Sequence, residues 1–171
     1  MPELLFDLST HDLSKDAVPL AEIRDAVPHR HEFALLDGVL SIRTDPVEAV
    51  GYHDARSDGF WVRGHIPGTP LFPGCLMVEA AAQLSSFCYR RKFGLEAGKF
   101  FGFGGIDKVK FRAMVKPGGR LLLLCKEIRL DRRYSRFAVQ GLCNGAVTFD
   151  GEIVGVMMPL KNLSDAASSG A

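Results

Sequence analysis

The sequence predicts an α+β fold in which an antiparallel sheet of about six strands wraps around one long buried helix. Residues 74–92 are apolar almost all round, which is typical of a helix buried on every side rather than one at the surface. From residue 99 onward, long stretches rich in β-forming residues are separated by short turns. Consecutive strands joined by short turns indicate an antiparallel sheet.

The first part of the chain contains a short helix and two strands. The helix is predicted for residues 20–26, because Pro28 disfavours helical geometry in the residue before it. The first strand is expected to take up most of residues 33–42. The turn at Asp45-Pro46 then leads into a second strand over residues 47–53.

Four further strands are predicted in the second half, at residues 100–115, 119–130, 134–143 and 146–158. Asn144-Gly145 between the last two is a favoured two-residue hairpin turn. The uninterrupted apolar run from Leu121 to Cys125 indicates a strand covered on both faces. We expect a partner subunit to provide part of that cover.

Length and composition indicate one domain. The chain has 171 residues, of which 47% are hydrophobic, enough for a sizeable core. The boundaries we expect are a surface extension at 1–19, the domain at 20–161 and a disordered tail at 162–171. The net charge of +1 argues against a nucleic-acid partner.

Neither a membrane span nor a cofactor is expected. The chain has no run of about eighteen apolar residues and no signal peptide at its start, which favours a cytoplasmic location. Its four cysteines lack metal-type spacing and lie in apolar segments, so we expect reduced, buried thiols. Zinc spacing, a phosphate loop and a nucleotide fingerprint are all missing from the sequence, so no metal or organic cofactor is expected.

The stretch from residue 64 to residue 83 carries the candidate chemistry. His65 lies in a loop stiffened by proline and glycine, and Glu79 lies inside the alanine-rich helix that follows. Gly74 begins this helix, where backbone N–H groups have no helical partner and attract negative charge. An imidazole, a carboxylate and a bare helix N-terminus suit proton transfer next to a carbonyl group.

Four motifs resemble the bacterial 3-hydroxyacyl-acyl-carrier-protein dehydratases, which have the hot-dog fold. They are VPHR at 27–30 with FALLD at 33–37, GHIPG at 64–68, PG at 73–74 with EA at 79–80 and Gln83, and GIDKVKF at 105–111 with PG at 117–118. The chain departs from this pattern at Gly38, where the family commonly has Arg, and at Gly119, where it has Asp. Phenylalanines replace a tyrosine thought to gate the acyl tunnel, and Phe100, Phe101 and Phe103 are candidates for the tunnel wall.

The resemblance implies a role for each residue of the central stretch. His65 is the expected base and Glu79 the expected acid, and Gln83, one helical turn further, is expected to hold the Glu79 carboxyl group. Apolar neighbours are expected to keep that carboxyl protonated, because burial disfavours the charged form. The N–H groups of Gly74 and Cys75 would hold the thioester oxygen. Phe72 is a further candidate for substrate contact.

The resemblance also implies the substrate and the assembly. The substrate would be a 3-hydroxyacyl thioester on acyl carrier protein, dehydrated to the trans-2-enoyl thioester in fatty-acid biosynthesis or a related lipid or polyketide pathway. His65 and Glu79 would meet across a homodimer interface, with a trimer of dimers as a larger assembly. Six cations could steer the acidic carrier protein: Arg90, Arg91, Lys92, Lys108, Lys110 and Arg112.

Two other functions stay open at this point. The first is a hot-dog thioesterase, which would hydrolyse the thioester, although the His65 and Glu79 pair favours elimination. The second is a non-catalytic acyl-binding or assembly subunit, which the departures at Gly38 and Gly119 leave possible. His29 and His31 are expected to be structural or surface residues.

Overall fold

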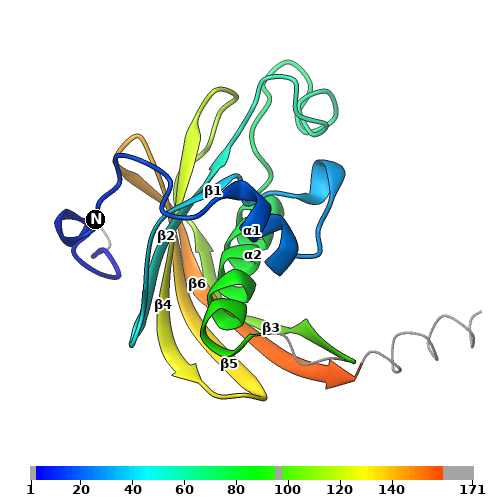
Figure 1. The fold of residues 1–171 in the computed structure, drawn as a ribbon. Coiled ribbons are helices and arrows are strands. Elements are labelled where there is room, and N and C mark those ends of the chain that lie inside the picture. Colours follow the sequence, from blue (N-terminus) through cyan, green and yellow to red (C-terminus); the bar gives the residue numbers. More distant parts are fainter. Residues whose placement is uncertain (1–2, 95–97, 160–171) are drawn as a thin grey trace, which may run out of the picture.

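A six-stranded antiparallel sheet curves around one central helix in the computed structural model, which describes residues 3–94 and 98–159 (Figure 1). The strand order is β1-β2-β4-β5-β6-β3. The strands are β1 (Gly38–Thr44), β2 (Val47–Asp54), β3 (Lys99–Phe111), β4 (Arg120–Leu130), β5 (Tyr134–Cys143) and β6 (Ala146–Pro159). The helices are α1 (Leu20–Ala26) and α2 (Gly74–Phe93), with short 3-10 turns η1 (Leu8–Thr10) and η2 (His31–Phe33). This arrangement confirms the predicted α+β, hot-dog architecture.

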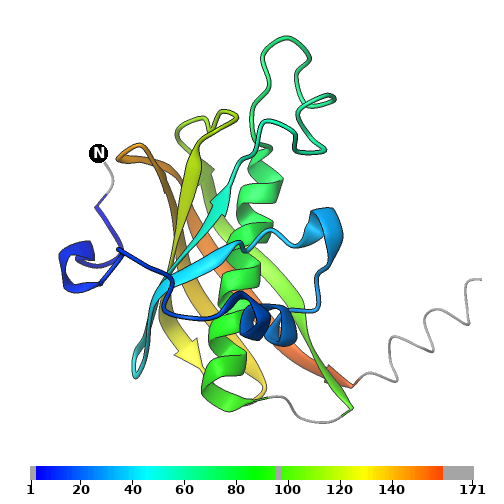
Figure 2. The ribbon, with the colours of Figure 1, turned by 45° about the horizontal axis from the view of Figure 1, so that its top comes forward.

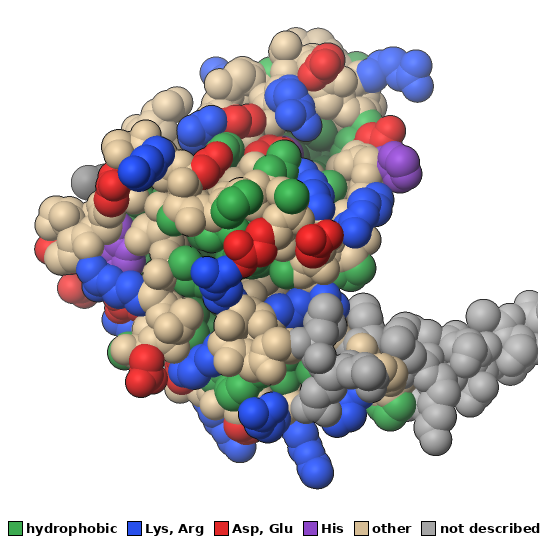
Figure 3. Space-filling view, in the orientation of Figure 1, with side chains coloured by type: hydrophobic (Ala, Val, Ile, Leu, Met, Phe, Trp, Pro, Cys, Tyr) green, Lys and Arg blue, Asp and Glu red, His purple; other side chains and the backbone are tan. Residues whose placement is uncertain are grey.

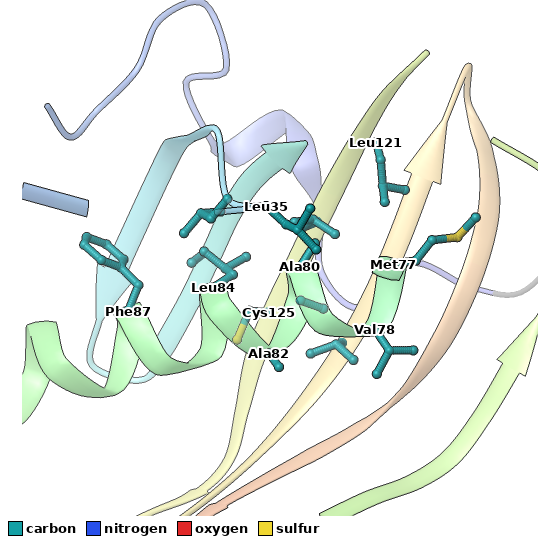
Figure 4. Packing of buried hydrophobic residues seen from close by; sticks show 14 of the residues in the cluster. Leu35, Met77, Val78, Ala80, Ala82, Leu84, Phe87, Leu121 and Cys125 are labelled. Carbon is teal, nitrogen blue, oxygen red and sulfur yellow. The ribbon is translucent and has the colours of Figure 1, made fainter. Parts of the chain in front are cut away.

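Helix α2 lies in the concave face of the sheet and packs into the main core, to which the strands also contribute buried residues such as Leu121 (Figure 4). Ala80 and Ala81 are fully buried, and their small side chains let the helix approach the strands closely. Leu84 and Phe87 fill the space one and two turns further along and are also buried. A helix surrounded in this way needs apolar residues on nearly all sides, which is the pattern that its sequence shows.

Strand β1 begins at Gly38 and not near residue 33 as predicted. His31 has a left-handed backbone with φ of 54°, and η2 follows. The N–H groups of Leu35 and Leu36 then donate to the side chain of Gln83 on α2 instead of to a neighbouring strand. Residues 33–36 therefore run along the helix and join the sheet only afterwards.

The outer face of the sheet is covered by the chain's own first residues. Residues 3–18, called the N-terminal strap below, cross this face (Figure 2). Phe6, Leu8 and Leu13 pack against a small cluster formed by Leu40, Val50 and Tyr52, with Leu122 beside it. Lys126 and Gln140 donate to the carbonyl oxygens of Leu5 and Glu3 at 3.1 Å each. Cover that we expected in part from a partner subunit therefore comes from the same chain.

In the part of the chain that the structure describes, neither helix combines the length and the apolar character needed to cross a membrane. The predicted tail at 162–171 lies outside the described residues.

The strap is held at its centre by a buried histidine. The His11 side chain has no exposed surface, and its Nδ1 atom lies 2.9 Å from the Ser41 hydroxyl. Burial lowers the pKa of His11, and the nearby Arg43 lowers it further, while Glu48 and Asp7 act in the opposite direction. The attached strap therefore favours the neutral imidazole.

We predict that acid weakens the attachment of the strap. A detached strap has His11 at its ordinary pKa, about 6.5, and takes up a proton at a higher pH than the buried ring does. Attachment is therefore strongest above about pH 6.5 and is lost progressively as the pH falls toward the lower pKa of the attached ring. Hydrogen exchange of residues 3–18, corrected for intrinsic rates, should be faster at about pH 5.5 than at about pH 7.5. A His11→Phe variant should lose most of this difference, and equal protection of the unmodified chain at both pH values would refute the prediction.

Candidate active site

Glu79 faces a largely apolar cavity of about 590 Å³ between α2 and strands β3 and β6. Its wall includes Phe101, Phe103, Phe111 and Ile153. This volume lies within the range of small-molecule sites in proteins. The cavity therefore suits an extended apolar ligand with a reactive group near Glu79.

Two side chains converge on one oxygen of Glu79. The Gln83 amide donates to Oε1 at 2.9 Å, and Nε2 of His29 lies 3.2 Å from the same atom. The Glu79 side chain is 24% exposed and that of His29 is 33% exposed. The apolar neighbours of Glu79 are buried in the core, but its carboxyl group opens onto the cavity. A single chain therefore encloses this group less completely than we expected.

The buried Gln83 amide uses all of its hydrogen-bonding capacity. Its Oε1 accepts from the N–H groups of Leu35 and Leu36, at 2.9 and 3.2 Å. Its Nε2 donates to the Phe33 carbonyl at 2.8 Å and to Glu79. Since both acceptor bonds come from backbone N–H groups, the orientation of the amide is determined, and its NH₂ group must face Glu79.

The N-terminus of α2 presents unpaired backbone donors beside the cavity. The N–H groups of Leu76 and Met77 donate to the Pro73 carbonyl, whereas those of Gly74 and Cys75 have no acceptor among the described residues. A Cβ atom on Gly74 would lie 2.7 Å from the Phe111 ring, so a larger residue there would require that exposed ring to shift. Cys75 lines the cavity and is exposed, unlike the buried thiol that we predicted.

His65 lies in the loop of residues 55–73, called the His65 loop below. Its Nδ1 atom lies 2.8 Å from the Leu71 carbonyl, and its backbone N–H donates to Trp61 at 2.7 Å. A carbonyl oxygen can only accept, so Nδ1 carries the hydrogen and Nε2 of the neutral ring has a free lone pair. The loop therefore presents an imidazole suited to act as a base.

Aromatic contacts hold the His65 loop to the domain. Phe72 is 2% exposed, stacks on His53 with ring centroids 4.7 Å apart, and meets Trp61 edge-on. Its backbone N–H donates to Val115 at 2.8 Å. Phe72, expected to contact substrate, is thus a buried anchor that does not line the cavity.

Beneath Phe72, His53 lies against a largely buried carboxyl group. His53 Nδ1 lies 2.9 Å from a carboxylate oxygen of Asp37. Burial alone would raise the pKa of Asp37, but His53 and the N–H of Asp54 outweigh it, so this pKa is lowered. Asp37 therefore favours its charged form and holds His53 beneath Phe72.

One chain does not bring all the predicted site residues together. Glu79, Gln83, Cys75, Phe101 and Phe103 line one cavity, but His65 is not among the described residues that line it. The His65 loop extends beyond the N-terminal end of α2 (Figure 2). The side chain of Phe100 lies outside what the structure describes.

Sequence reasoning missed the position of His29, which lines the cavity beside Glu79. Its place in the VPHR motif was the available signal. The contact between His29 and Glu79 depends on how the following residues, 33–36, attach to α2.

The departures at Gly38 and Gly119 fit their surroundings. The Tyr52 ring fills the space beside Gly38, where a Cβ atom would lie 2.3 Å from it. The guanidinium of Arg120 lies 4.0 Å above that ring and pairs with Asp54. The Gly119 carbonyl accepts from the N–H of Ala55 at 2.9 Å and so joins the His65 loop to the sheet.

Solved structures share this fold at low sequence identity. A dehydratase heterocomplex, ApeI:P from Xenorhabdus doucetiae, matches with a TM-score of 0.69 and 19% identity, covering 88% of this chain and 97% of that one. A mutant thioesterase, PA1618 from Pseudomonas aeruginosa, matches with a TM-score of 0.61 and 15% identity, covering 86% and 99%. At such identities the likeness establishes the fold alone.

Relatives found by sequence identify the family of this chain more specifically than the solved structures do. The 3-hydroxyacyl-[acyl-carrier-protein] dehydratase FabZ of Clostridium botulinum (strain Loch Maree / Type A3) is 34% identical over 133 residues, covering 78% of this chain and 87% of the relative. The FabZ of Hydrogenobaculum sp. (strain Y04AAS1) is 31% identical over 143 residues, covering 83% and 96%. A model of the FabA-like domain matches residues 27–157, which include the central helix, the cavity and the His65 loop. The chain therefore belongs to the FabA-like family.

Proposed function

We propose that the protein dehydrates 3-hydroxyacyl thioesters of acyl carrier protein to trans-2-enoyl thioesters, in fatty-acid biosynthesis or a related lipid or polyketide pathway. The observation that carries the proposal is the placement of Glu79, held by Gln83 at an apolar cavity that begins at the N-terminus of α2. The two FabZ relatives bear the name of this activity. A cytoplasmic location is part of the same proposal.

This mechanism uses a base, an acid and a pair of backbone donors. His65 Nε2 removes the proton next to the thioester carbonyl, and Glu79 gives a proton to the departing 3-hydroxyl group, so water leaves as the carbon–carbon double bond forms. A positioned acid or base contributes about 10²–10⁴-fold in rate. The N–H groups of Gly74 and Cys75 stabilise the negative charge on the thioester oxygen, and one such donor is worth about 10²–10³-fold.

The site is shared between two copies of the chain in this proposal. The His65 loop extends beyond the N-terminal end of α2, and His65 is not among the described residues that line the cavity holding Glu79, so a second copy would have to provide the base. Strand β3 lies at the sheet edge and exposes Phe103, Ile106 and Phe111, each about half exposed. An unpaired edge with exposed apolar side chains favours pairing with another chain. A partner at β3 would also shield Glu79 from water.

Steering of an acidic carrier protein depends on fewer cations than the sequence indicated. Ion pairs join Arg91 to Glu22, Lys92 to Glu127, Lys108 to Glu152 and Arg112 to Asp150. Acidic and basic side chains are interspersed over the face in Figure 3. We therefore propose only moderate steering, with a correspondingly moderate salt dependence of association.

A turnover assay separates this function from its two alternatives. The purified protein is incubated with a 3-hydroxyacyl thioester of acyl carrier protein. Ultraviolet absorbance of the conjugated enoyl product supports dehydration, release of free carrier thiol supports a thioesterase, and binding without turnover supports an acyl-binding subunit.

We predict that His65→Ala lowers kcat by at least about 10²-fold, because it removes the base. Thermal unfolding should stay unchanged, since the His65 side chain is exposed. Thr69→Ala, an exposed position of the same loop, is the matched control and should keep full activity. Full activity of the His65→Ala variant would exclude this mechanism.

A shared site predicts complementation between two inactive variants. When His65→Ala and Glu79→Gln chains exchange freely, about half of the dimers are mixed, and each mixed dimer has one intact site of two, so about a quarter of the wild-type rate should return. Native mass spectrometry of isotope-labelled chains verifies that mixed dimers form. Mixed dimers without recovered activity would show that His65 and Glu79 act within one chain.

A further inference from the structure

The neighbourhood of Glu79 holds a second ionisable group that the proposed mechanism does not use. His29 lies between α1 and η2, four residues before Phe33, whose carbonyl accepts from the Gln83 amide. The Arg30 guanidinium donates back to the carbonyls of Val27 and His29, at 2.7 and 2.9 Å, and closes the backbone around it. His29 is thus held at the cavity wall by bonds on both sides.

The described contacts of the Glu79 carboxyl group are made to only one of its two oxygens. Gln83 Nε2 and His29 Nε2 both approach Oε1, and no described residue makes a hydrogen bond or ion pair with Oε2. Oε1 accepts a hydrogen bond from Gln83 and lies 3.2 Å from a ring nitrogen of His29, so it is a poor place for an acidic proton. The proton of a neutral Glu79 therefore belongs on Oε2, the oxygen free to meet a substrate hydroxyl group.

The second ring nitrogen of His29 indicates which tautomer it adopts. Nδ1 is buried and has no hydrogen-bond partner among the residues that the structure describes. Buried N–H groups without an acceptor are rare, so a hydrogen on Nδ1 is disfavoured. In the neutral ring the hydrogen then lies on Nε2, the nitrogen 3.2 Å from Oε1 of Glu79.

We propose that His29 is a positioning residue that directs the acidic proton of Glu79 to Oε2. This inference rests on the proposed dehydration. As Glu79 gives its proton to the departing hydroxyl oxygen, the C–O bond breaks, water forms and the carboxyl group becomes a carboxylate. The Nε2–H of His29 and the Gln83 amide then stabilise the new charge on Oε1.

Three variants test this role. His29→Phe keeps a flat ring but removes the donor, and His29→Gln offers a side-chain N–H at a similar distance from the backbone. His29→Phe should lower kcat by about 10–100-fold, the range measured for groups that orient metal ligands, while KM changes little. His29→Gln should recover most of that loss. His31→Asn, two residues further on and exposed, is the matched control and should behave as wild type.

A double-mutant cycle shows whether His29 acts through Glu79. In a Glu79→Gln background, His29→Phe should lower the free energy of unfolding in urea by less than it does in the unmodified chain. Additive effects on unfolding would overturn the inference, and so would equal loss of kcat in His29→Phe and His29→Gln.

The unfolding cycle needs no turnover, so it separates this inference from the proposed function. An unmodified chain that does not dehydrate the substrate disproves the function. Non-additive effects of the two substitutions on the free energy of unfolding would then still support the contact between His29 and Glu79. An active chain without coupling refutes the role of His29 alone.

Discussion

The side-chain amide of Gln83 is the interaction on which the arrangement of this protein depends. It is 1% exposed and makes four hydrogen bonds, three to the backbone of residues 33–36 and one to Glu79. Leaving such buried groups unpaired costs about 1–3 kcal/mol each. One side chain therefore couples the path of the chain before β1 to the orientation of a carboxyl group on α2. The hydrogen bonds of Gln83 thus stabilise the fold and also orient the Glu79 carboxyl group.

The two candidate proton-transfer groups are held in different ways. Glu79 lies on a rigid helix packed against the sheet, and its geometry follows from the core. His65 lies on a loop whose attachment depends on Phe72, Trp61 and the backbone bonds at its base. A loop of this kind can be adjusted by a neighbouring molecule without disturbing the core. This division suits a site completed only on assembly.

Much of the fold could be predicted because its signals are local. The apolar length of α2 and the turn at Asn144-Gly145 fix element boundaries within a few residues. The path of residues 33–36 could not be predicted, since Leu35 and Leu36 have a strand-like pattern and their partner, Gln83, lies far along the chain. The cover over Leu122 was missed for the same reason, because Phe6, Leu8 and Leu13 of the strap lie far from it in the sequence.

The site was predictable in its parts and less so in its contacts. Glu79, Gln83 and Cys75 share one helix, so their spacing alone brings them together at one cavity. His29 and Phe72 depend on tertiary packing. The first lies beside Glu79 because Gln83 holds its segment, and the second is buried because it meets His53. A motif identifies residues, but their partners come from the fold.

The N-terminal strap has a consequence for the order in which this chain acquires its structure. Its carbonyl oxygens at Leu5 and Glu3 accept from Lys126 and Gln140, which lie 121 and 137 positions later in the sequence. During synthesis the strap is made well before the strands that receive it. Contacts of such long separation form slowly, because a large loop must close. The part of the outer face that the strap covers thus stays open to water until these later strands have formed and the strap docks on them.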